Sequence, residues 1–160
     1  MNKRIIICGP SASGKNYLRD LWVFRGFESD VSYTTRAPRP GEVPGKDYNF
    51  LSRENFKNKI KMNGFYESVE YKRELYGTGK IEWEERDIFI METEGISKIK
   101  AEDRKSCFII FLDPPKDSRI KRMAVERGWK WDEISKRLDF DEKCFKGFSD
   151  YDIKLTNAYF

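Results

Sequence analysis

One short segment constrains the fold of this chain more than any other. Residues 9–15 read Gly9-Pro10-Ser11-Ala12-Ser13-Gly14-Lys15 and match G-x-x-x-x-G-K. The apolar run Arg4–Cys8 before it predicts a buried strand, and residues 15–25 after it predict a helix with one apolar face. Such a turn surrounds a phosphate with backbone N–H groups and the positive end of a helix, and Lys15 adds charge. The segment therefore predicts a phosphate loop.

Asn16 departs from this motif, which normally places a Ser or Thr hydroxyl on Mg²⁺ at that position. An amide oxygen is a hard, neutral ligand, but it stands one atom further out. We expect either that Asn16 holds Mg²⁺, directly or through water, or that the nucleotide phosphates hold most of the ion.

Further apolar runs at 88–91, 107–112 and 153–155 predict strands, and they alternate with expected helices. These helices cover 52–63, 95–101 and 115–127, with a last one capped by Asp132. Fully apolar strands separated by helices imply a parallel sheet covered on both faces. The fold class is therefore α/β, a three-layer fold around the phosphate loop. Residues 33–83 interrupt the alternation and indicate an inserted subdomain.

Composition bounds the chemistry. A chain of 160 residues is one ordinary domain, and its charge of +4 is too mild to identify a partner. Since it has no histidine, it cannot use a Ser-His-Asp triad or His-ligated metals. The lysines at 57, 59 and 61 are interpreted as a solvated helix face, so no nucleic-acid partner is expected. No run approaches a membrane span, and three scattered cysteines favour a reducing compartment, so we expect a cytoplasmic protein of undetermined oligomeric state.

A second anion site is indicated by Arg36 and Arg39, which lie three residues apart in a loop stiffened by prolines. Arginine forks match phosphate oxygens, and prolines reduce the entropy cost of holding such a loop. Taken alone, a pair of loop arginines is more often solvated surface. The surrounding segment changes that interpretation.

The stretch Val31–Phe50 closely resembles the nucleotide-monophosphate loop of guanylate kinases. The likeness continues through Phe65-Tyr66-Glu67, Tyr76-Gly77-Thr78, Arg119–Leu138 and Asn157. It implies one domain over 1–160, with a core (1–32, 84–115 and 132–160), an acceptor subdomain (33–83) and a lid (116–131). It further implies transfer of the γ-phosphate of ATP to GMP or dGMP, giving ADP and GDP, with Mg²⁺ as cofactor.

The resemblance also implies individual roles. The catalytic cations would be Lys15, Arg122, Arg127 and Arg137. ATP would contact the loop Gly9–Lys15, Asn16 and Asn157. GMP would contact Ser32, Arg36, Arg39, Tyr48, Glu67, Tyr76, Thr78 and Glu92. Where the family has an Asp pair, this chain has Ile90 and Glu92, and the loss of the first carboxylate puts the metal geometry in doubt. Arg119 is expected to be an ordinary helix-face charge.

The chemistry of guanine supports the role implied for Glu67. Guanine presents two adjacent donors, N1–H and the N2 amine, and an ionised carboxylate can accept from both. Adenine would leave that carboxylate unpaired, which allows discrimination of about 10⁴–10⁵. Because the second pKa of a phosphate monoester is about 6, the acceptor is largely anionic at neutral pH and needs no general base.

Two alternatives remain open. The chain is short between Gly79 and Asp87, where a helix of the acceptor subdomain is expected to be missing, and this trimming favours a kinase with a different or broader acceptor. Asn16 and Ile90 favour a weakened module that binds phosphorylated peptides through Arg36 and Arg39. The intact phosphate loop argues against that module.

Overall fold

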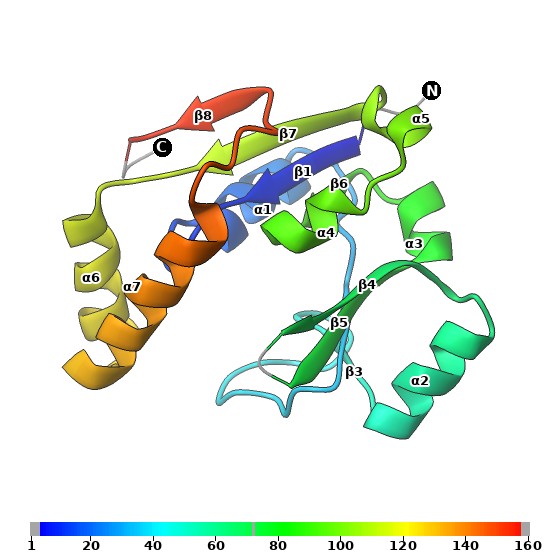
Figure 1. The fold of residues 1–160 in the computed structure, drawn as a ribbon, viewed down its shortest axis with the longest axis horizontal. Coiled ribbons are helices and arrows are strands. Elements are labelled where there is room, and N and C mark those ends of the chain that lie inside the picture. Colours follow the sequence, from blue (N-terminus) through cyan, green and yellow to red (C-terminus); the bar gives the residue numbers. More distant parts are fainter. Residues whose placement is uncertain (1–3, 72, 158–160) are drawn as a thin grey trace.

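The computed structural model describes residues 4–71 and 73–157 (Figure 1). The outermost residues of the predicted core, 1–3 and 158–160, lie outside this description. The main sheet has the order β6 (Ile88–Ile90), β1 (Arg4–Cys8), β7 (Cys107–Leu112) and β8 (Ile153–Leu155). Every neighbouring pair in it is parallel. The predicted α/β class is confirmed.

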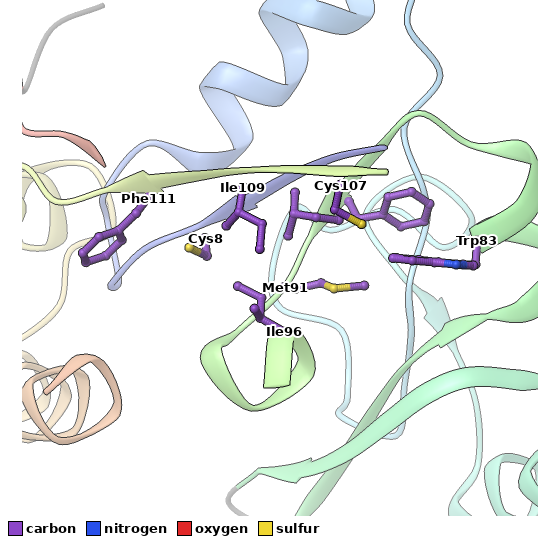
Figure 2. Close-up of a cluster of buried hydrophobic side chains, with 9 residues drawn as sticks. Cys8, Trp83, Met91, Ile96, Cys107, Ile109 and Phe111 are labelled. Carbon is purple, nitrogen blue, oxygen red and sulfur yellow. The ribbon is translucent and has the colours of Figure 1, made fainter. Parts of the chain in front are cut away.

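Both faces of this sheet are covered, because successive side chains of each buried strand point to opposite sides. On one face Ile6, Cys8, Phe89, Ile109 and Phe111 pack with Trp83, Met91 and Ile96 (Figure 2). On the other face Ile7, Ile110 and Leu112 pack against Leu18 and Trp22 of α1 (Lys15–Phe24). Full burial of such side chains contributes about 1.5–3 kcal/mol each, which explains the unbroken apolar runs.

The helices that follow the central strands are α4 (Thr93–Ser97), α5 (Ala101–Arg104), α6 (Lys116–Val125) and α7 (Trp131–Phe145). The prediction of a single helix over 95–101 is wrong. The backbone N–H of Lys100 donates to the Tyr66 hydroxyl at 3.1 Å instead of continuing the helix, and Lys100 is extended.

The prediction that Asp132 caps the last helix is also wrong. Lys130 is the N-cap residue of α7, and its backbone N–H donates to the Glu133 carboxylate at 3.0 Å. Asp132 lies instead in the first turn, where a negative charge faces the positive helix end.

A second sheet has the order β3 (Asn49–Phe50), β2 (Tyr33–Thr34), β5 (Glu74–Gly79) and β4 (Phe65–Tyr71). Helix α2 (Arg53–Lys61) packs on it through Phe56, whose ring stacks on Phe65 at 4.4 Å. Ser52 caps α2 as predicted, since its hydroxyl accepts from the Asn55 N–H at 3.1 Å.

The helix expected to be missing between Gly79 and Asp87 is present as the short α3 (Lys80–Glu85). Its Trp83 is 3 % exposed, joins the core of the main sheet, and stacks on Tyr66 with centroids 3.9 Å apart. In Figure 1, α3 lies between the two sheets, while α6 and α7 form a separate arm at the opposite end of the main sheet. Trp83 therefore joins the small sheet to the large one.

Candidate functional site

The phosphate loop begins at the carboxyl end of β1, and its path depends on glycine. Gly9 has φ +152°, and a methyl group there would lie 2.3 Å from the backbone oxygen of Leu112. Gly14 is the N-cap residue of α1 in the left-handed region. No larger residue fits the contact of Gly9 with β7. The chain is thereby turned so that α1 starts beside the loop.

The Lys15 side chain folds back onto this loop. Its ammonium group donates to the backbone oxygens of Gly9 and Pro10, the latter at 3.2 Å. Burial and then Arg137 lower the pKa of Lys15, while the negative charges of Glu92 and Asp141 oppose this. Asn16 follows with an exposed side chain in the first turn of α1.

A buried ion network supports the loop from behind. Asp141 of α7 is 3 % exposed, and its Oδ2 accepts from the Ser11 N–H at 2.9 Å and from Arg119 Nη1 at 3.1 Å. Its Oδ1 accepts from the Ser11 hydroxyl at 3.1 Å and faces Arg137. The expectation that Arg119 is an ordinary helix-face charge is wrong, since it is 8 % exposed and also contacts the Ser11 backbone oxygen.

Three other arginines approach the loop or its rim. Arg122 Nη1 donates to the backbone oxygen of Ala12 at 3.0 Å. Arg137 Nε donates to the Ser11 hydroxyl. Arg127 stacks over Trp129 at 5.2 Å, and its pKa is lowered by loss of solvent and by repulsion from Arg39 and Arg137. Positive charge from α6, α7 and the residues between them thus converges on the phosphate loop.

The second predicted anion site is a preformed loop. Arg36 makes two hydrogen bonds to the Glu42 carboxylate, at 2.9 and 2.8 Å, and lies 5.2 Å from the Tyr48 ring centroid. Burial would lower the pKa of Arg36, but the Glu42 pair raises it. The Arg39 N–H donates to the same carboxylate at 2.7 Å, while the Arg39 residue is exposed. Tyr48 lies 6.2 Å from Tyr76.

Glu67 is a buried carboxylate with one oxygen hydrogen-bonded and the other not. It is 9 % exposed, and its Oε1 accepts from the Thr78 N–H at 3.1 Å. Its Oε2 is buried and has no hydrogen-bond partner among the described residues. Burial raises the pKa of Glu67, and hydrogen bonds from Thr78 oppose this. Gly95 lies beside the free oxygen: a methyl group at Gly95 would lie 3.5 Å from it, at an ordinary contact distance.

Glu92 and Tyr71 lie between the phosphate loop and the tyrosines beside the Arg36 loop. The charge of Glu92 acts on Lys15, on Tyr48 and on Tyr71, so it lies between the phosphate loop and the tyrosines. The Tyr71 hydroxyl accepts a hydrogen bond from Arg137, and its ring lies 6.1 Å from that of Tyr76. The contacts Arg137–Tyr71 and Tyr71–Tyr76, with that of Tyr76 and Tyr48, therefore link the phosphate loop to the loop that carries Arg36.

The other residues predicted from the sequence lie at the periphery of the candidate site. Ser32 donates to Asp30 at 2.6 Å, and the charge of Glu67 acts on Asp30. Asn157 follows β8, at the carboxyl edge from which the phosphate loop also leaves. Ile90 is packed with the apolar side chains of the sheet. Sequence reasoning missed Asp141 and Tyr71. The i,i+4 spacing of Arg137 and Asp141 was a usable signal, whereas nothing in the sequence marks Tyr71.

Fold and site together define a protein with a phosphate loop, a second loop that carries Arg36 and Arg39, and the buried carboxylate of Glu67. The family model for guanylate kinase matches residues 1–160. The guanylate kinase of Streptococcus thermophilus is 36% identical over 163 residues, covering 96% of this chain and 78% of that protein. That of Clostridium tetani is 36% identical over 161 residues, covering 96% and 77%. The chain belongs to the guanylate kinase family.

The fold is also found in a solved structure. The crystal structure of guanylate kinase from Anaplasma phagocytophilum aligns with a TM-score of 0.69 at 23% identity, covering 98% of this chain and 77% of that one. The helices also bear on membrane insertion: within residues 4–71 and 73–157, no helix has both the length and the apolar character needed to cross a membrane.

Proposed function

We propose that this protein transfers the γ-phosphate of ATP to GMP or dGMP. A phosphate oxygen of GMP attacks the γ-phosphorus, the bond from that phosphorus to the β,γ-bridging oxygen breaks, and ADP and GDP result. The observation that carries the proposal is the buried Oε2 of Glu67, which is unpartnered among the described residues. It lies beside Gly95, which follows three residues after Glu92, and the charge of Glu92 acts on Lys15. Family membership supports the same reaction.

The acceptor base would be read by Glu67. Its free oxygen matches the N1–H and N2 donors of guanine, and pairing would remove the cost of an unsatisfied buried carboxylate, which is about 1–3 kcal/mol or more for a charged group. Thr78 holds the other oxygen and so fixes the carboxylate plane. Ser32 would supply a hydroxyl to the same base.

The acceptor phosphate would bind at Arg36, Arg39, Tyr48 and Tyr76. Glu42 holds the Arg36 guanidinium and the Arg39 backbone in place, which reduces the ordering cost on binding. The phosphate would then point toward Glu92 and the phosphate loop. No general base is required, because the attacking oxygen is already anionic.

The ATP donor would lie along residues 9–15, and Asn157 would contact its adenine base. Lys15, Arg122, Arg127 and Arg137 would neutralise charge that develops on the transferred phosphoryl group. An arginine in this role can contribute about 10³–10⁵ in rate. We further propose that the segment 116–131 closes as a lid over the site and excludes water, which would otherwise consume ATP.

Asn16 fits a role in holding Mg²⁺ together with the nucleotide. Its amide oxygen is a suitable ligand, and it is exposed in the turn that follows Lys15. Among the described residues no group of three or more His, Cys, Asp or Glu side chains could hold a metal ion alone. Bound Mg²⁺ would supply charge neutralisation at the phosphates. ATP and GMP are metabolites of the cytoplasm, which supports a cytoplasmic location.

A coupled assay of ADP formation tests the proposal with GMP, dGMP, AMP and a phosphorylated peptide as acceptors. We expect turnover with GMP or dGMP and little with AMP. Glu67→Gln should lower kcat/KM for GMP by about 10- to 100-fold, since it removes charge-assisted hydrogen bonds. Lys15→Met should remove most turnover.

Glu70→Gln is the matched control, because Glu70 lies on the same strand with its side chain exposed. Failure of both GMP and dGMP as acceptors would contradict the proposal. Similar turnover with GMP, dGMP and AMP would indicate the alternative, a kinase with a broader acceptor. Peptide binding without Mg²⁺-dependent ATP binding would indicate the recognition module.

A further inference from the structure

A second carboxyl group, that of Asp30, lies beside the proposed base pocket. Its Oδ2 accepts a hydrogen bond from the Ser32 hydroxyl at 2.6 Å. Its Oδ1 is buried and has no hydrogen-bond partner in the described part of the chain. The Asp30 backbone N–H donates to the Ile88 oxygen at 2.8 Å, so the edge of the main sheet holds this residue in place. Asp30 is therefore fixed against Ser32.

The charges that face Asp30 are mostly negative. Glu82 of α3 and Glu67 of β4 both act on it, and Arg86 is the opposing cation. Arg86 is itself paired with Glu28 at 2.6 Å. Burial, followed by the two glutamates, raises the pKa of Asp30 to about 7, although the Ser32 hydrogen bond and Arg86 oppose the change.

Glu82 is held close by the hydroxyl of Tyr33, which donates to its Oε1 at 2.6 Å. Its Oε2 is buried and unpartnered among the described residues, as are Glu67 Oε2 and Asp30 Oδ1. Proximity of like charges makes simultaneous ionisation unfavourable. Of these carboxyl groups, Asp30 is the one that contacts the Ser32 hydroxyl.

A serine hydroxyl has one proton to donate, and this gives Asp30 control over Ser32. While Asp30 is ionised it can only accept, so the Ser32 proton points to it and Ser32 offers the pocket only lone pairs. When Asp30 carries a proton, its carboxyl group can donate to Ser32 Oγ. The Ser32 proton is then free to point toward a ligand.

We propose that Asp30 is a positioning residue for the acceptor base, and that its protonation decides whether Ser32 donates a hydrogen bond to guanine O6. This inference rests on the proposed function. Guanine combines the O6 acceptor with the N1–H and N2 donors, and Glu67 can serve only the donors. When Asp30 is protonated, guanine O6 can therefore be paired with Ser32 while N1–H and N2 are paired with Glu67. Protonation also removes a negative charge beside Glu67.

Two consequences can be measured. Relative to that of a neutral Asp30 variant, the dissociation constant of GMP should rise by about tenfold between pH 6 and pH 8, because the fraction of protein with Asp30 protonated falls. Binding at pH 8 should take up a fraction of a proton from solution. Calorimetry in buffers of different ionisation enthalpy measures both, and the KM for GMP provides the kinetic counterpart.

Asp30→Asn is the main variant, because its amide can donate to Ser32 at every pH. Its GMP affinity should vary much less with pH, and its proton uptake should vanish. Asp30→Ser is a second neutral variant that serves if the first does not fold. Glu85→Gln, an exposed position on the same helix as Glu82, should keep the wild-type profile. Titration of the GMP phosphate affects every protein equally and cancels in the ratio to wild type.

Superimposed pH profiles of the wild type and a folded neutral Asp30 variant would overturn this inference, as would a wild-type affinity for GMP that rises with pH relative to that variant. If the wild type phosphorylates GMP and the profiles superimpose, only the role of Asp30 fails. If the wild type neither binds nor phosphorylates GMP at any pH, the proposed function fails and this inference fails with it.

Discussion

Arg137 of α7 donates a hydrogen bond to the hydroxyl of Tyr71 at the end of β4. The same guanidinium donates to Ser11 in the phosphate loop. One side chain therefore connects the small sheet with the loop that leaves the main sheet. Removing the Tyr71 hydroxyl would break this connection while leaving the bond to Ser11 in place.

Tyr71→Phe should lower kcat/KM for GMP by about 10- to 100-fold, because it removes one hydrogen bond to a charged group, and such a bond contributes about 1.5–3 kcal/mol. The ring contact with Phe140, at 4.7 Å, would remain. The unfolding temperature should therefore change little. A kinetic loss equal for GMP and for ATP hydrolysis in water would contradict a role in aligning the acceptor.

Arg39→Ala should raise the KM for GMP by about 10- to 100-fold and leave the KM for ATP nearly unchanged. The Arg39 side chain is exposed, and its backbone N–H keeps the bond to Glu42 after substitution. Only the proposed phosphate contact is then lost. Lys46→Ala removes an exposed charge from the same loop and serves as the control. Equal losses for both nucleotides would refute this assignment.

Asp141→Ala should reduce the free energy of unfolding by about 3–5 kcal/mol, as expected when one partner of a buried ion pair is removed. Arg119 would be left buried without its carboxylate, and Ser11 would lose two hydrogen bonds. Urea denaturation measures the loss. The double variant Asp141→Ala with Arg119→Met should recover part of it, because the uncompensated charge is gone. If the single variant unfolds like the wild type, the network is not supporting the loop.

Asp30 should make stability depend on pH. Its pKa is about 7 in the folded protein against a reference value of 3.8, so the folded state binds the proton more tightly. Its contribution to stability is full below pH 3.8 and is lost as pH rises through about 7. Asp30→Asn should therefore be more stable than the wild type at pH 8, with the difference shrinking toward pH 4. Thermal unfolding across this range checks the sign; a gain confined to low pH would contradict it.

The sequence by itself determined the phosphate loop, the buried strands and the second anion loop. These are local properties: Gly9 and Gly14 are required by backbone geometry, and the run Cys107–Leu112 can be buried only as a strand covered on both sides. The family likeness extended this to individual residues such as Glu67, but it could not say which oxygen of that carboxylate is free.

Tertiary structure alone decided the pairings between distant segments. Arg119 and Asp141 are unremarkable charges on separate helices until packing removes both from water, and Tyr71 acquires meaning only beside Arg137. Asp30 resembles any loop carboxylate until Glu67 and Glu82 fold around it. Burial and the field of neighbouring charges depend on three-dimensional proximity, which residue order does not contain.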